Sequence, residues 1–181
     1  TTTVVAGQAF ALTTDGETFT GGAGADTFRA VIDDNTATNN TMTASDTLIG
    51  GTGEDTLTMI FDVSAAGVAM PASDVSGIEN IVVRNISGQT ATVNLGNMTG
   101  ETDVDVDRST ARTDITGIGA GTEVKISGDG TVVNAAVNLT YGATVTSNAL
   151  AVDGDTTGGA VVITSAAATA LTVTSSGGTN V

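Results

Sequence analysis

The sequence predicts an all-β protein, and within that class a parallel β-solenoid of the β-roll or β-helix kind. Three observations lead to this fold class. Short segments rich in Val and Thr recur between glycine-containing corners, one glycine-rich pattern of nine residues occurs twice, and only 3% of the residues are aromatic, with no Trp. Thr and Val favour strands, and a narrow solenoid interior accepts small stacked side chains. A β-sandwich is the alternative, because it too is built from short, evenly spaced strands.

The nine-residue pattern occurs as GGAGADTFR at residues 21 to 29 and as GGTGEDTLT at residues 50 to 58. Both copies have glycine at the first, second and fourth positions. The sixth position holds Asp26 or Asp55, and the eighth holds Phe28 or Leu57. We expect the apolar residue at position eight to point into the solenoid.

Each copy follows a degenerate unit of the same length. These units are LTTDGETFT at 12 to 20, with Glu17 at position six, and TMTASDTLI at 41 to 49, with Asp46 there. The first glycines of the two good copies are 29 residues apart, and removing a polar insert of eleven residues at 30–40 leaves 18. Two nine-residue units then make one coil, so the two glycine loops should lie on the same edge, in adjacent coils.

The chain divides into residues 1–60, which hold the glycine loops and the insert, and residues 61–181, which continue the same solenoid without the motif. Short apolar segments mark the expected strands of the second part. They lie at 81–83, 93–95, 104–106, 124–126, 137–139, 150–152, 161–163 and 171–173, with Ile115 in the longest gap. The alanine-rich segment 165–173 has some helix propensity, but its Thr and Gly neighbours favour a solenoid coil.

Composition restricts the possible functions. The formal net charge is −15, from 20 acidic and 5 basic residues, which disfavours nucleic acid and anionic membranes as partners and favours cations. The chain has neither Cys nor His and a single tyrosine, Tyr141, so we expect no enzyme activity. No apolar run is long enough to insert into a bilayer. An acidic chain without Cys is consistent with an exported, extracellular protein.

The glycine pattern suits a hard cation. Glycines allow backbone conformations with positive φ that turn carbonyl oxygens inward, where a Cβ would obstruct them. The carboxylate at position six adds charge, and Ca²⁺ accepts six to eight such oxygen ligands. The motif therefore predicts calcium as the cofactor.

The pattern GGxGxDxUx, with U a large apolar residue, resembles the calcium-binding nonapeptide of RTX proteins. The resemblance covers residues 12 to 58. It implies a right-handed parallel β-roll with one Ca²⁺ between loop 21–26 and loop 50–55. The implied ligands are the carboxylates of Asp26 and Asp55 and backbone carbonyls around Gly22, Gly24, Gly51 and Gly53. On the opposite edge, Glu17 and Asp46 would form a degraded, weaker site, because the glycines are missing there.

The layout of the chain resembles the surface-layer and surface-filament proteins of Gram-negative bacteria. Two glycine loops, a polar insert, the segment VSGIENIVV at 75 to 83 and a long Thr/Val-rich region occur in that order. The resemblance implies type I secretion, a place on the bacterial cell surface and calcium-driven folding and self-assembly into a lattice or filament. Partners would be further copies of the chain and cell-surface polysaccharide. A calcium-dependent adhesin or carbohydrate-binding module, and a polysaccharide-degrading β-helix enzyme, are the alternatives.

One further set of acids has a regular spacing. Asp103, Asp105 and Asp107 alternate with valines, so all three should lie on one face of a strand. Like charges placed side by side are destabilising unless they are neutralised. We expect Arg108 and Arg112 to neutralise them.

Overall fold

The computed structural model describes residues 5–128, 135–154 and 159–177. In these ranges the chain forms three β-sheets, and the single helix is the three-residue 3₁₀ helix η1 (Leu95–Asn97). A helix of that length cannot cross a membrane, and these ranges contain no other candidate. The strand pairs described here are all parallel. The fold is therefore the predicted β-solenoid and not the alternative β-sandwich, whose sheets are antiparallel.

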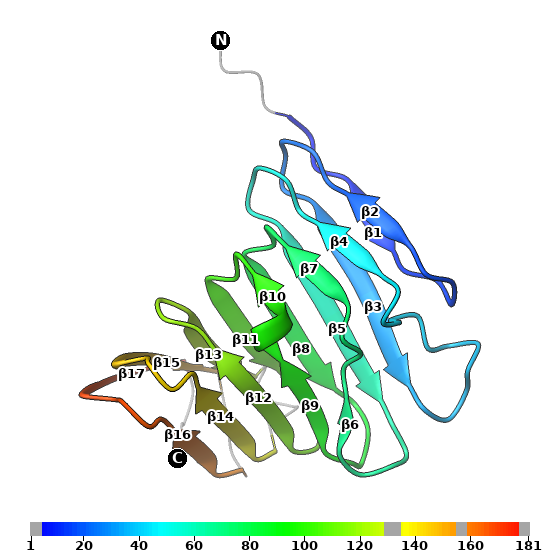
Figure 1. The fold of residues 1–181 in the computed structure, drawn as a ribbon. Helices are drawn as coiled ribbons and strands as arrows, with labels where there is room; N and C mark the ends of the chain where they lie inside the picture. Colours follow the sequence, from blue (N-terminus) through cyan, green and yellow to red (C-terminus); the bar gives the residue numbers. More distant parts are fainter. Residues whose placement is uncertain (1–4, 129–134, 155–158, 178–181) are drawn as a thin grey trace.

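Sheet A forms one side of the solenoid along its whole length (Figure 1). In spatial order its strands are β1 (Ala9–Ala11), β3 (Thr27–Asp33), β5 (Thr56–Asp62), β8 (Asn80–Asn85), β11 (Asp103–Asp107), β13 (Glu123–Ser127), β15 (Ser147–Asp153) and β17 (Ala170–Ser176). This sheet is continuous across the boundary at residue 60, so the two predicted parts of the chain share one solenoid.

Two smaller sheets form the opposite side. Sheet B contains β10 (Met98–Thr99), β7 (Asp74–Ser76), β4 (Thr47–Ile49) and β2 (Thr18–Thr20). Sheet C contains β16 (Val161–Thr164), β14 (Val137–Tyr141), β12 (Thr113–Ile118), β9 (Ala91–Asn94) and β6 (Val68–Ala69). The chain visits both small sheets between β5 and β8 and again between β8 and β11, so these two coils join the glycine-loop end to the rest.

The strand register confirms the predicted length of a coil. Ala9 pairs with Thr27, an offset of 18 residues, and Thr27 pairs with Thr56, an offset of 29. The larger coil carries the polar insert, although the predicted insert 30–40 begins too early. The first residues of the predicted insert, 30–33, belong to β3 instead, because Ala30 and Ile32 are buried in the core.

The core consists of ladders of apolar side chains that repeat from coil to coil. In sheet A one ladder joins Phe10, Phe28, Leu57, Ile81, Val104, Val124, Leu150 and Val173. Phe28 and Leu57, the residues at position eight of the motif, are buried as predicted. At the N-terminal end the ring of Phe10 stacks on Phe28, with centroids 4.9 Å apart. Each inward side chain therefore packs on its equivalent in the neighbouring coils.

The last coil that the structure describes is exposed. Leu171 is 51% exposed and Val173 is 55% exposed, although their partners Asn148 and Leu150 are buried. Val173 continues the core ladder of sheet A, and Leu171 lies two residues before it on the same face of β17. No further coil covers these two residues within the described ranges. The alanine-rich segment 165–173 forms no helix, and its last residues begin β17.

Candidate metal site

The two glycine loops lie one above the other on a single edge of the solenoid, as predicted. The Gly21 amide donates to the Ile49 carbonyl at 2.7 Å, and the Thr52 amide donates to the Gly22 carbonyl at 2.9 Å. Gly51 and Gly53 have φ values of 109° and 148°, which disfavour other residues. The loops are thus held together by direct backbone contact.

Glycine is also required because the backbones are so close. A Cβ on Gly51 would collide with the carbonyl oxygen of Gly22, and one on Gly53 would collide with that of Gly24. A Cβ on Gly21 would collide with the carbonyl oxygen of Gly50. Three carbonyl oxygens therefore face the neighbouring loop across the contact between loop 21–26 and loop 50–55.

The two motif aspartates are buried at this edge of the solenoid. Asp26 is 1% exposed and Asp55 is 0% exposed. The Asp26 carboxylate accepts from the Gln8 amide at 2.6 Å and from the Gly22 amide at 2.5 Å. The Asp26 amide in turn donates to Oδ1 of Asp55 at 2.7 Å. The structure thus brings together the two residues that the motif pairs.

A third acid, Glu79, continues the column of carboxylates. The backbone amide of Asp55 donates to Oε2 of Glu79 at 2.9 Å. This bond repeats the one from the backbone amide of Asp26 to Oδ1 of Asp55 in the preceding coil. Asn80 pairs with Thr56 and Thr56 with Thr27, so Glu79 occupies the position of Asp26 and Asp55 one coil further along. Sequence reasoning missed this residue because its loop, 77–79, lacks the GGxGxD pattern. A glycine two residues before an acid and an apolar strand was the available signal.

Buried like charges at this spacing are unfavourable by themselves. Neighbouring coils lie about 4.8 Å apart, and two unit charges about 5 Å apart repel by about 3 kcal/mol at an effective dielectric constant of about 20. Loops 21–26, 50–55 and 77–79 contain no Lys or Arg. Three of the five basic side chains pair with acids elsewhere: Arg108 with Asp107, Arg112 with Asp114 and Lys125 with Asp153.

The opposite edge brings together Glu17 and Asp46. Asp46 is 1% exposed, and its carboxylate accepts from the amides of Glu17 at 2.9 Å and Thr43 at 2.7 Å. Oε1 of Glu17 accepts from the Thr13 amide at 3.1 Å and from the Thr13 hydroxyl. Oε2 of Glu17 is buried without a hydrogen-bond partner among the described residues. Of the four carboxylate oxygens of Glu17 and Asp46, Oε2 of Glu17 alone lacks a hydrogen-bond partner among the described residues. Neither loop at this edge has the GGxGxD pattern.

The atoms that could bind a metal at the glycine edge suit a hard cation. They are all oxygen atoms, and Oδ2 of Asp55 is buried with no hydrogen-bond partner in the described part of the chain. Across the described ranges, no three acidic, His or Cys side chains gather into a group that could hold a metal ion. Calcium at this edge would therefore need carbonyl oxygens beside the carboxylates, as the motif implies.

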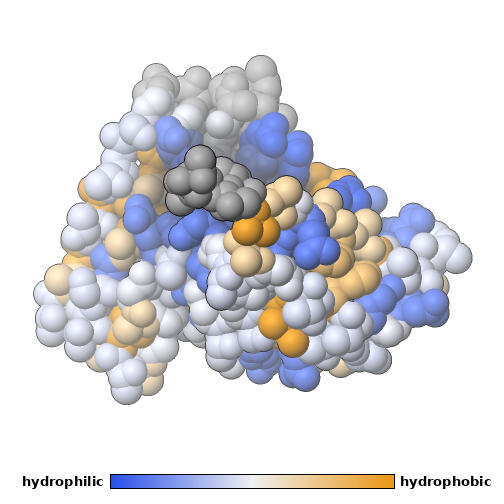
Figure 2. All heavy atoms as spheres, turned by 90° about the horizontal axis from the view of Figure 1, so that it is seen from above, coloured by the Kyte–Doolittle hydropathy of each residue, from blue (hydrophilic) through white to orange (hydrophobic). Residues whose placement is uncertain are grey.

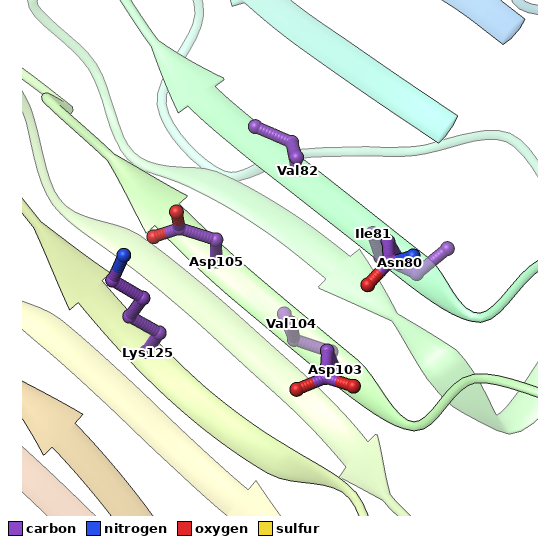
Figure 3. Close-up of a pocket in the computed structure, with 7 residues that line it drawn as sticks. All are labelled: Asn80, Ile81, Val82, Asp103, Val104, Asp105 and Lys125. Carbon is purple, nitrogen blue, oxygen red and sulfur yellow. The ribbon is translucent and has the colours of Figure 1, made fainter. Parts of the chain in front are cut away.

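The outer face of sheet A carries a second set of acids (Figure 3). Asp103, Asp105 and Asp107 lie on one face of β11, as predicted. The Arg108 guanidinium donates to Asp107, with Nε 2.7 Å from Oδ1. Arg112 contacts Asp114 instead, on β12 in sheet C, so its predicted role was wrong.

The carboxylate of Asp105 is stabilised by other residues. The Ser127 hydroxyl donates to its Oδ1 at 2.7 Å, and Lys125 lies opposite it in the strand register. Burial raises the pKa of Asp105 in spite of these neighbours. Beside it, Asn80, Val82, Asp103 and Lys125 line a shallow hollow of about 230 Å³ (Figure 3).

Comparisons of this chain with protein-family models, with curated proteins and with solved structures find no significant match.

Proposed function

We propose that this protein is a structural, self-assembling extracellular protein, a subunit of a surface layer or filament, whose folding and assembly are driven by calcium. The observation that carries the proposal is the stack of two GGxGxD loops one coil apart, with two buried carboxylates and no basic residue within either loop. Asp26, Asp55 and the carbonyls of Gly22, Gly24, Gly51 and Gly53 would hold the ion. Calcium supplies positive charge here and no reactive group.

Calcium would couple folding to export. Without the cation, the stacked carboxylates repel one another and disfavour the folded state in a compartment poor in calcium. Outside the cell, binding to the folded state alone stabilises it, by about 2.7 kcal/mol per site when free calcium is 100 times the dissociation constant. Type I secretion, which exports unfolded chains, fits this order of events.

Self-assembly would use the exposed strand β17. β17 is seven residues long, its side chains are all exposed, and residues 159–177 contain no charged residue. Edge strands usually carry charges or are short, which prevents association. In a chain of net charge −15, this uncharged segment is a place where a second copy would meet little charge repulsion.

The hydropathy of the surface is compatible with a polar partner. In the view of Figure 2, white and blue residues predominate and hydrophobic ones occupy smaller areas between them. This face has the composition of one that contacts water or polysaccharide.

The test is circular dichroism and sedimentation velocity with CaCl₂ and with EGTA. We expect the β signal and the larger species to appear with calcium and to disappear when EGTA removes it. MgCl₂ at equal concentration is the control, because the small octahedral ion fits carbonyl-rich loops poorly. An unchanged β signal together with an unchanged mass would overturn the proposal.

A calcium-dependent adhesin is the second candidate, and the hollow beside Asp105 is the observation that favours it. Its lining offers amide, carboxylate and ammonium groups that could bind hydroxyls of a sugar. Aromatic platforms are missing from it, and Tyr141 is buried with its hydroxyl donating to the Ala149 carbonyl at 3.1 Å. Electron micrographs separate the candidates: ordered arrays of the protein alone favour the structural role, and a persistent monomer that binds glycans favours the adhesin.

A further inference from the structure

The glycine edge continues beyond the two loops that carry the motif. The Gly50 amide donates to the Ser76 carbonyl at 2.9 Å, and a Cβ on Gly50 would collide with the carbonyl oxygen of Gly77. Loop 77–79 therefore lies against loop 50–55 as that loop lies against loop 21–26. Loops 21–26, 50–55 and 77–79 thus make two successive contacts, of which only the first is visible as a repeated motif in the sequence.

The motif carboxylates differ in how completely they are satisfied. Both oxygens of Asp26 accept backbone amides, from Gln8 and Gly22. In Asp55 only Oδ1 does, and Oδ2 is left without a partner although the residue is 0% exposed. Gly51, the residue equivalent to Gly22, has a φ of 109° and donates no such bond to Asp55 in the described structure. A buried carboxylate oxygen in this state needs a donor or a cation.

The unpartnered oxygen faces the contact with loop 77–79. The point where a Cβ of Gly50 would lie is 2.6 Å from Oδ2 of Asp55 and closer still to the Gly77 carbonyl oxygen. Both oxygens thus converge on the same side of Gly50. The Glu79 carboxylate is adjacent, since its Oε2 accepts from the Asp55 amide.

We propose that a second calcium ion binds between loop 50–55 and loop 77–79, held by the carboxylates of Asp55 and Glu79 and the carbonyl oxygen of Gly77. The inference rests on the proposed function for the identity of the cation. Two carboxylates match a divalent charge, and the mixture of carboxylate and carbonyl oxygens in an irregular loop suits Ca²⁺ better than Mg²⁺. Asp55 is then shared by two ions, one on each side of its loop.

The test counts calcium ions by equilibrium dialysis against CaCl₂ for the whole chain. We expect the wild type to bind one ion more at this edge than the variant Glu79→Gln, and we expect Asp26→Asn to lose the other ion while keeping this one. Glu79→Gln keeps an oxygen that can accept from the Asp55 amide, so the fold should survive. Glu123→Gln, an exposed change of the same charge on sheet A, is the matched control and should bind as the wild type does.

The outcomes separate this inference from the proposed function. If Glu79→Gln binds as many ions as the wild type and with the same affinity, while Asp26→Asn loses one, the second site is wrong and calcium binding stands. If the wild type binds no calcium at millimolar concentration, both fail. Should Glu79→Gln not fold, the wild type is titrated by ¹H–¹⁵N NMR. Shifts of the Gly77 and Glu79 amides on calcium addition support the second site, and their absence overturns it.

Discussion

Two sets of neighbouring acids in this solenoid have opposite surroundings. At the glycine edge, Asp26, Asp55 and Glu79 follow one another from coil to coil, and no basic residue lies in their loops. On the outer face of sheet A, Asp105 and Asp107 have Lys125, Ser127 and Arg108 beside them. Coil stacking places the acids of the glycine edge about 4.8 Å apart, whereas alternation along β11 places its acids about 7 Å apart. A sheet face can supply basic side chains from the same and neighbouring strands, but a glycine loop offers only backbone oxygens, so its charge calls for a cation from solution.

The largest effect should come from neutralising Asp55. In saturating calcium, Asp55→Asn should lower the free energy of unfolding by about 3 kcal/mol for each ion lost, if free calcium is 100 times the dissociation constant. In EGTA the same variant should be at least as stable as the wild type, because one of the stacked charges is gone. Urea denaturation under both conditions measures this. Asp62→Asn, exposed at the end of β5, is the control. An equal loss with and without calcium would contradict the cation.

The next effect concerns the coupling of the two motif aspartates. Asp26→Ala and Asp55→Ala should damage the same calcium site, so their effects on calcium-dependent stability should not add. We expect a double-mutant cycle to give a coupling of about 0.5 to 3 kcal/mol, the range for residues within one network. The titration of the double variant should show no further loss of the shared ion. Two independent losses would count against a site between the loops.

A smaller effect is expected on the outer face. Lys125→Met keeps the aliphatic stem but removes the charge that lies 3.2 Å from Asp153 and opposite Asp105. Because the amine is partly exposed, the loss should be at most about 1 kcal/mol and should shrink at 1 M NaCl. Urea denaturation at low and high salt measures it. A loss that is insensitive both to salt and to calcium would point to packing instead of charge.

The smallest effect, of opposite sign, is expected for Asp105→Asn. Burial raises the pKa of Asp105 above its ordinary 3.8, so the folded protein holds this proton more tightly than the unfolded chain does. The ionised form therefore costs stability at neutral pH, and the cost disappears as the pH falls through the raised pKa towards 3.8. Asp105→Asn should be slightly more stable than the wild type at pH 7 and should lose this advantage in acid. An advantage that grows as the pH falls would contradict this.

Local pattern predicted most of the fold. The alternation in 81–83, 104–106 and 124–126 placed the central strands of sheet A, and these segments lie in β8, β11 and β13. The offset of 18 residues between units is the register that joins β1 to β3. Both predictions succeed because side-chain alternation and coil length are properties of neighbouring residues.

The sequence could not reveal how the other side of the solenoid divides. Strands β6 and β7 lie in the same coil but in different sheets, and coil length does not decide this, because the longer coil from β3 to β5 contributes only β4, to sheet B. The start of the insert was also misplaced, because residues 30–33 are polar in part but alternate towards the core. The division into sheets and the start of the insert both depend on which side chains face the core. The spacing of residue types along the sequence does not determine this.

The sequence by itself determined the class of fold, the pairing of the two glycine loops and the acidic character of their edge. These follow from the period of the repeat and from the types of residue within it. The tertiary structure alone decided that Glu79 joins Asp26 and Asp55, that Arg112 binds Asp114, and that one oxygen of Asp55 is buried without a partner. The physical reason is that coil stacking brings together residues 24 to 29 positions apart through backbone pairing, and the lengths of the intervening loops set which ones meet.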